Sequence, residues 1–455
     1  MTADDGGSRG RHISRRRALA IGGAAALSLA STSRLPSAST GSDPDEANAS
    51  ENGGREGDAD ALGRIHRAGI TGEGVDVAVL DPTGFDPTHD AVAGGIREIR
   101  QFGSRSAVAE RTTHGTGAAA AVAELAPDAR LSLASFDTPA EFVAAVEWCR
   151  ERETDVLLAP VAAHGSVATG RSDVARAAGR AVDAGCVLVA PTGNAALGHW
   201  EGPAAALLGD GETDPRRLRI RPLPGADSVR GRFRAWLVVD ASVESDLTLA
   251  LLRAVDGGRR WNLLAVSRAV DSRAGQRLTA DLDDGTHALV VRADGAEADR
   301  RPDANASRIE IATPTHALSS ARPLGSVAVP ASVPGVVGVG VTDAARTEAE
   351  SADSAAAPVA PYSGRGPVAG GDLGVDVVAP PRPWIADGRP GTSAAAARVA
   401  GVAALLRAAD PELEPSAVTR TLRASAADVG RAGPDVVSGH GRLAPLAAVQ
   451  RVRAR

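Results

Sequence analysis

Short apolar runs alternate with helix-like stretches from residue 72 onward. The run VDVAVL at 75–80 predicts a fully buried strand, and HGTGAAAAVAELA at 114–126 predicts a helix that ends at Pro127. Further strands are expected at 129–136, 154–162 and 186–194, and further helices at 139–152 and 172–184. This βαβ repetition predicts a parallel sheet with helices on both faces.

The alternation breaks near residue 205. Strand-like pieces with glycine-containing turns and no clear helix between them fill 229–295, which favours a small antiparallel β-sandwich. Valine-rich strands return at 325–341, and the helix expected at 393–409 ends at Asp410-Pro411. We therefore expect an α/β fold, a three-layer, doubly wound and mostly parallel sheet, with an inserted β-sandwich at 205–315.

Composition narrows the class of protein. The chain has 455 residues, of which 43% are hydrophobic but only 2% aromatic, so its core must be built from valine and alanine. A net charge of −6 argues against a nucleic-acid-binding protein. Two cysteines are too few for a disulfide-scaffolded domain. Cys149 and Cys186 either pair at one edge of the sheet or remain two buried thiols.

The first 40 residues have the pattern of an export signal. Adjacent arginines at 15–17 precede an apolar, alanine-rich run to Ala30, the layout of a twin-arginine signal peptide; a membrane-touching amphipathic helix is the alternative. This run is too short to span a bilayer. The acidic segment 41–60 is expected to be a solvated linker. We expect a secreted or cell-surface protein without a stable membrane anchor once the signal is removed.

Three reactive side chains stand at the ends of predicted elements. Asp81 follows the strand 75–80, His114 opens a helix between polar and glycine residues, and Ser393 stands at the amino end of the last long helix. A serine nucleophile needs a neutral imidazole to take its proton, and that imidazole needs a carboxylate to fix its tautomer. Each residue also has a structural interpretation, as a turn residue or a helix cap.

These segments resemble the subtilisin-like serine peptidases. VDVAVLDPTGFDPTHDAV, HGTGAAAAVAELAPDARL and GRPGTSAAAARVAGVAALLRAA are similar to that family's aspartate, histidine and serine segments, in the order Asp, His, Ser. VLVAPTGNAA is similar to the segment that supplies the oxyanion-hole amide, here Asn194, although a turn asparagine is the alternative. The resemblance covers about 61–204 and 316–455, which it makes the two parts of one catalytic domain.

The resemblance implies an exported serine endopeptidase acting on protein or peptide substrates. Asp81, His114 and Ser393 would be its catalytic residues, and Pro160, Val161 and Ala162 would line a substrate pocket. No cofactor is needed for this chemistry. Structural calcium is frequent in the family, but the sequence indicates no ligand set.

The chain departs from the family pattern around each reacting group. Pro82 lengthens the turn after Asp81, and Gly117 stands where the family usually has a second histidine. Ala397 and Arg398 replace the Pro-His that follows the family's serine. These changes leave open an alternative function, that of a catalytically impaired pseudopeptidase acting as an extracellular binding protein.

Overall fold

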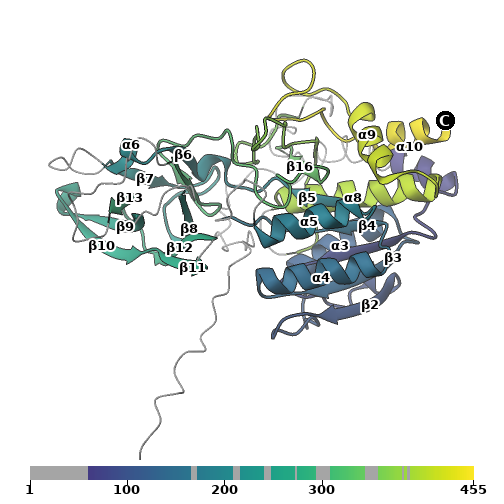
Figure 1. The fold of residues 1–455 in the computed structure, drawn as a ribbon, viewed down its shortest axis with the longest axis horizontal. Coiled ribbons are helices and arrows are strands. Elements are labelled where there is room, and N and C mark those ends of the chain that lie inside the picture. The colour runs from purple at the N-terminus through teal and green to yellow at the C-terminus, as the bar shows by residue number, and fades with distance from the viewer. Residues whose placement is uncertain are drawn as a thin grey trace, which may run out of the picture.

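The computed structural model describes residues 60–164, 172–208, 216–239, 247–271, 274–293, 308–343, 357–381, 384–386 and 390–455. They form an α/β body and, beside it, a part made of antiparallel sheets (Figure 1). The expected signal and nearly all of the acidic linker lie outside these residues.

The α/β body is built on a seven-stranded sheet in the order β17-β16-β5-β4-β1-β3-β2. All its neighbouring strands run parallel, which confirms the predicted fold class. Most strands are buried on both faces, the reason they read as unbroken apolar runs. Their bounds are β1 Asp76–Leu80, β2 Ile96–Gln101, β3 Arg130–Ser135, β4 Val156–Leu158, β5 Val187–Pro191, β16 Val337–Val341 and β17 Val377–Ala379.

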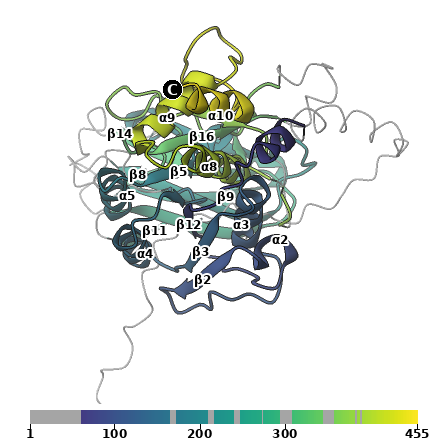
Figure 2. The ribbon, with the colours of Figure 1, turned by 90° about the vertical axis from the view of Figure 1, so that its right-hand side faces the viewer.

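Helices cover both faces of this sheet and complete three layers (Figure 2). Helices α3 (His114–Leu125) and α8 (Thr392–Ala409) share one hydrophobic core with α9 (Pro415–Ser425) and α10 (Pro445–Arg453). Helices α4 (Pro139–Glu151) and α5 (Asp173–Asp183) bury their apolar faces in the core on the other side. The short helix α2 (Asp90–Ala93) contacts α3.

Small residues let α3 and α8 approach closely. A Cβ atom added at Gly401 would lie 2.8 Å from the Cβ of Leu125, so a larger residue there would push the helices apart. Helix α8 is buried along most of its length, from Thr392 to Leu406. A helix enclosed on all sides needs apolar side chains all round, which accounts for its alanine-rich, non-amphipathic sequence.

Two five-stranded antiparallel sheets, ordered β10-β9-β13-β7-β15 and β11-β12-β8-β14-β6, enclose a separate hydrophobic core. Strands β6 and β15 belong to these sheets although both lie outside 205–315, so the boundary of the insertion stays a prediction. The bounds are β6 His199–Pro203, β7 Leu218–Arg221, β8 Gly231–Val239, β9 Leu247–Val255, β10 Arg260–Val266, β11 Arg268–Asp271, β12 Ala274–Leu282, β13 His287–Ala293, β14 Arg308–Ala312 and β15 Ala317–Leu318, with α6 at Ala205–Leu208.

Two expected strands are shorter than their apolar patterns. The run 154–162 contains only β4, and 325–341 contains only β16; the other residues of these runs lie in turns and irregular segments, with an isolated bridge between Ala163 and Val329. Cys149 and Cys186 are buried free thiols, and burial raises the pKa of Cys186 to about 12. None of the described helices is long and apolar enough to cross a membrane.

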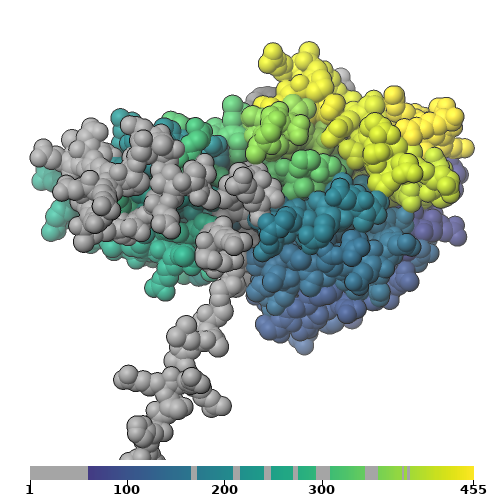
Figure 3. All heavy atoms as spheres, in the orientation of Figure 1, coloured from purple at the N-terminus to yellow at the C-terminus, as the bar shows by residue number. Residues whose placement is uncertain are grey.

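In the space-filling view, the α/β body and the antiparallel part lie side by side (Figure 3). Residues near Asn194 run directly into β6, which pairs with β14. The antiparallel part is therefore joined by continuous backbone to the sheet edge that carries Asn194.

Candidate active site

Asp81 lies at the carboxyl end of β1 and is fully buried. Its Oδ2 is 2.6 Å from Nδ1 of His114. Its Oδ1 accepts hydrogen bonds from the backbone N–H of Thr83 at 2.9 Å and from the Thr83 hydroxyl at 2.5 Å. Because both carboxylate oxygens have partners, the side chain is held in one orientation.

His114 is the first residue of α3, and local capping fixes where that helix begins. Thr113 and Thr116 form a reciprocal capping box, and the Thr113 hydroxyl donates to the carbonyl of Gly84 at 2.5 Å. At Gly115, an added Cβ would lie 2.6 Å from the Gly84 carbonyl oxygen, so only glycine fits against the turn that follows Asp81. The His-Gly pair thus docks α3 onto that turn, with the imidazole 17% exposed.

Ser393 is the second residue of α8, at the amino end of the helix. It is 8% exposed, and its hydroxyl donates to the carbonyl of Pro160 at 2.9 Å. Among the described residues, this carbonyl and not His114 is the partner of the Ser393 hydroxyl. Attack on a substrate would therefore require rotation about the Cα–Cβ bond of Ser393.

Asn194 follows β5 and is held against the residue before Ser393. Its Oδ1 accepts hydrogen bonds from the Thr392 backbone N–H at 3.1 Å and from the Thr392 hydroxyl at 3.0 Å. With Oδ1 occupied in this way, Nδ2 remains to donate. A Cβ added at Gly391 would lie 2.7 Å from that Nδ2, so glycine at this position keeps space beside the amide.

Thr392 is a residue of this site that the sequence interpretation missed. The sequence does contain a signal for this role: a threonine directly precedes the candidate nucleophile at a helix start, where a hydroxyl and a free N–H are both available. Its contribution is to orient the Asn194 amide, 198 residues away along the chain.

The proposed pocket residues Pro160, Val161 and Ala162 follow β4. Pro160 contacts Ser393 through its carbonyl, and Val161 is buried. The next residue, Ala163, donates its N–H to Val329 at 2.7 Å, which anchors the segment. The segment borders the candidate nucleophile; the role of its side chains in specificity stays a prediction.

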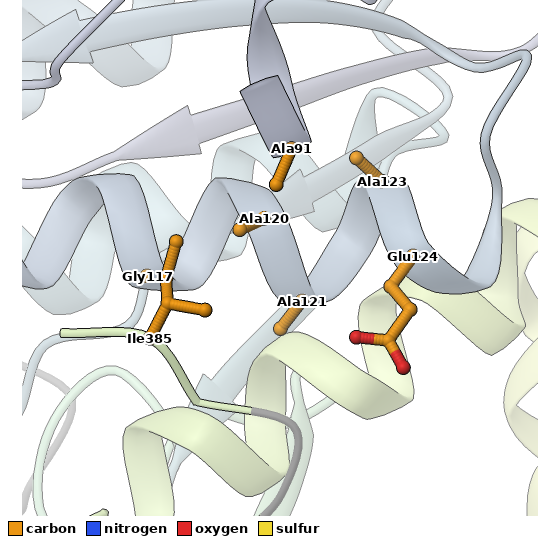
Figure 4. A pocket seen from close by; sticks show the side chains of 7 residues that line it. All are labelled: Ala91, Gly117, Ala120, Ala121, Ala123, Glu124 and Ile385. Carbon is orange, nitrogen blue, oxygen red and sulfur yellow. The ribbon is translucent and has the colours of Figure 1, made fainter. Parts of the chain in front are cut away.

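Trp384 is a second residue that sequence interpretation missed. Its ring contacts the imidazole of His114 edge to face, with centroids 5.1 Å apart and an interplanar angle of 67°. Its neighbour Ile385 lies beside Gly117 on α3 (Figure 4). Gly117 in place of a histidine was the signal in the sequence, because a missing side chain there leaves room for another segment.

Two further histidines near these segments are buried. His164 has an Nε2 atom without a hydrogen-bond partner in the described part of the chain, and its ring lies 5.4 Å from that of Trp236. Burial, with a smaller effect of His199, lowers the pKa of His164 to about 4. Nδ1 of His199 donates to the Arg322 carbonyl, 2.5 Å away, and Nε2 of His199 lies 3.6 Å from Oε1 of Glu310.

The lowered pKa of His164 predicts loss of stability in acid. The folded protein keeps His164 neutral down to a pH of about 4, whereas the unfolded chain takes up the proton near 6.5, so stability should fall as the pH drops from 6.5 toward 4. The full loss is about 3 kcal/mol. In urea unfolding at pH 7, 5.5 and 4.5, His164→Phe should show a shallower loss than wild type. His89→Asn, which keeps a capping acceptor on α2, serves as control; equal slopes in His164→Phe and wild type would contradict this prediction.

In the described ranges, no three histidine, cysteine or acidic side chains come together as a metal site. Structural calcium therefore stays an expectation from the family resemblance, with no ligand set among the described residues.

Comparisons with known proteins agree with the fold. The family model Peptidase_S8, the subtilase family, matches residues 72–441. The structure is similar to that of the CspB protease of Clostridium perfringens, with a TM-score of 0.56, 17% identity, and coverage of 85% of this chain and 96% of that one. Weaker likenesses are to MycP1 without its propeptide (TM-score 0.43, 18% identity, 85% and 94% coverage) and to the prenylagaramide maturation protease PagA (0.45, 16%, 86% and 98%). No curated protein matches the chain.

Proposed function

Because the chain belongs to the subtilase family of peptidases, we propose that it is a serine endopeptidase that cleaves peptide bonds through Ser393, His114 and Asp81. The observation that carries this proposal is the 2.6 Å hydrogen bond between the His114 imidazole and the buried Asp81 carboxylate. An aspartate held in this way by Thr83 fixes the imidazole with Nδ1 protonated, leaving Nε2 as the base.

The reaction would proceed through an acyl-enzyme. The Ser393 hydroxyl leaves the Pro160 carbonyl, gives its proton to His114 and attacks the scissile carbonyl carbon. His114 then passes that proton to the leaving amine, and the C–N bond breaks. The same imidazole then takes a proton from water, whose oxygen attacks the ester carbonyl, and gives that proton to the Ser393 oxygen as the ester C–O bond breaks.

The developing oxyanion would be stabilised by the Nδ2 of Asn194 and by the Ser393 backbone N–H. The latter lies in the first turn of α8, where backbone N–H groups lack helical partners and the helix dipole favours negative charge. Thr392 holds the amide of Asn194 in place before substrate arrives, so this oxyanion donor needs no reorganisation during the reaction.

Asn194→Ala should lower kcat about 10² to 10³-fold and leave KM nearly unchanged, because the amide donates mainly to the charge that develops in the transition state. Steady-state kinetics on a peptide substrate would measure this. Asn262→Ala, an exposed asparagine on β10, is the matched control and should behave as wild type. A rise in KM with unchanged kcat would contradict the oxyanion role.

A fluorophosphonate probe tests the proposed function, because it forms a covalent bond only with an activated serine. We expect the wild type to be labelled at Ser393, and His114→Ala to be labelled far more slowly. The second candidate, a catalytically impaired binding protein, is favoured by one observation: the Ser393 hydroxyl is bonded to Pro160 and not to His114. Absence of labelling in a folded wild type would support this second candidate and overturn the first.

We further propose that the protein is exported by the twin-arginine route and acts outside the cytoplasm on proteins or peptides. The support is the arginine cluster at 15–17 followed by an apolar run. Replacing Arg15, Arg16 and Arg17 by alanine should leave the protein inside the producing cell, as fractionation would show.

A further inference from the structure

The segment Trp384–Ala386 lies across the first turns of α3, next to the candidate catalytic histidine. A Cβ atom added at Gly117 would be 2.9 Å from the Cβ of Ala386 and 3.4 Å from the indole of Trp384. Any side chain larger than glycine at 117 would therefore push the segment outward. The glycine that replaces the family's second histidine is what allows Trp384 to reach His114.

This segment presents apolar surface to solvent beside the imidazole. Trp384 is partly buried against the core beneath it, and Ile385 is 40% exposed, one of few large apolar side chains so exposed in the described chain. Between Ile385 and helix α3 lies a hollow of about 240 Å³ (Figure 4). The hollow is lined mainly by alanines, which are small and apolar. Its surface along α3 is therefore uncharged from the end near His114 as far as Glu124.

A substrate would have to pass this surface. The scissile carbonyl carbon must come within about 3 Å of the Ser393 hydroxyl, and His114 must be within hydrogen-bond reach of that hydroxyl and of the leaving nitrogen, so the residues that flank the bond run alongside the imidazole. The Nδ1 edge of that imidazole is closed by Asp81, and Trp384 covers a further side. A substrate side chain beside His114 would therefore lie against the indole of Trp384, and a bulky side chain would clash with it.

We propose that Trp384 and Ile385 form a substrate-selecting wall beside His114, which favours small apolar residues at one position within two residues of the cleaved bond. This proposal rests on the proposed peptidase function. The indole excludes aromatic and long side chains by occupying their space. Charged side chains are disfavoured because they would lose water against an apolar wall.

The wall can be tested with a mixed peptide library cleaved by wild type, Trp384→Ala and Trp384→Phe. We expect wild type to prefer Ala over Phe at the position beside His114 by about 10-fold or more. Trp384→Ala should reduce that preference to about 3-fold or less, through faster cleavage of bulky peptides, and Trp384→Phe should retain most of it. Trp261→Ala, in the antiparallel sheets, is the control for loss of a tryptophan.

A second variant alters the same wall without removing the indole of Trp384. Gly117→Ala should displace Trp384 and Ala386 and relax the same preference by an intermediate amount. Gly179→Ala is its matched control, since an added Cβ in the middle of α5 would meet only one side-chain atom, at an ordinary 4.0 Å. Its preference should equal that of wild type.

Labelling with the fluorophosphonate probe separates failure of the wall from failure of the function. If the wild type is labelled and cleaves peptides, but Trp384→Ala and Gly117→Ala keep its preference, the wall is overturned and the peptidase function stands. If a folded wild type is neither labelled nor active, both are overturned. A preference that relaxes at the same position in both variants, but in neither control, supports the wall.

Discussion

Ser393→Ala should abolish fluorophosphonate labelling and lower kcat for peptide cleavage by about 10⁵ to 10⁶-fold, the largest effect of any single substitution expected in this chain. The methyl group cannot attack a carbonyl, and only substrate binding and the oxyanion donors would remain to assist water. Folding should be preserved, because the variant loses one hydrogen bond, to the Pro160 carbonyl, and leaves no cavity.

Thermal unfolding and peptide kinetics together check this expectation. Ser425→Ala is the matched control: its hydroxyl also donates to a backbone carbonyl, that of Thr421, but at the end of α9. The control should keep both labelling and turnover. If Ser393→Ala retained substantial cleavage, the nucleophile would have to be another residue and the proposed mechanism would be wrong.

Asp81→Asn should lower kcat by about 10⁴-fold while the fold is kept. The hydrogen bonds around the carboxylate give the reason. An asparagine would place its carbonyl oxygen toward the two Thr83 donors and its NH₂ toward His114. Since that NH₂ can only donate, Nδ1 of His114 would have to accept, and the proton would move to Nε2. The base needed by Ser393 would then be protonated at the wrong nitrogen.

The rate of Asp81→Asn should partly recover as the pH is raised, because hydroxide can replace the lost base, whereas that of the wild type should level off. A pH–rate profile from 6 to 10 measures this difference. Asp137→Asn is the control, since this carboxylate also accepts from a backbone N–H and a hydroxyl, those of Ser104, but is paired with Arg105 and not with the imidazole of His114. An Asp81→Asn enzyme with wild-type kcat at pH 7 would contradict the role of Asp81.

The structure explains how the residues that depart from the family pattern fit at their positions in α8. Alanine replaces larger residues after Ser393 where α8 is enclosed on every side, and Gly401 touches α3. Arg398 is buried within the same helix. Burial of Glu124 on α3 raises the pKa of that carboxyl group, and the positive charge of Arg398 partly offsets the increase. Neither change displaces Ser393 from the amino end of its helix. The altered residues therefore affect packing around α8 and not the placement of Ser393.

Local sequence determined the elements and the residue types at their ends. Apolar runs predict β1 and β5, and capping residues predict the start of α3. These signals act over a few residues, so they can be interpreted from the sequence alone. The order of Asp81, His114 and Ser393 and their resemblance to a known family followed from the same segments.

Only the tertiary structure decided which of these residues meet. Pro160 and Ser393 are 233 residues apart, and Asn194 and Thr392 are 198 apart, so their hydrogen bonds depend on how α8 packs on the sheet. The contact of Trp384 with His114 depends on space left by a missing side chain at Gly117. No local pattern encodes such contacts, because each arises from the close packing of segments that are distant in sequence.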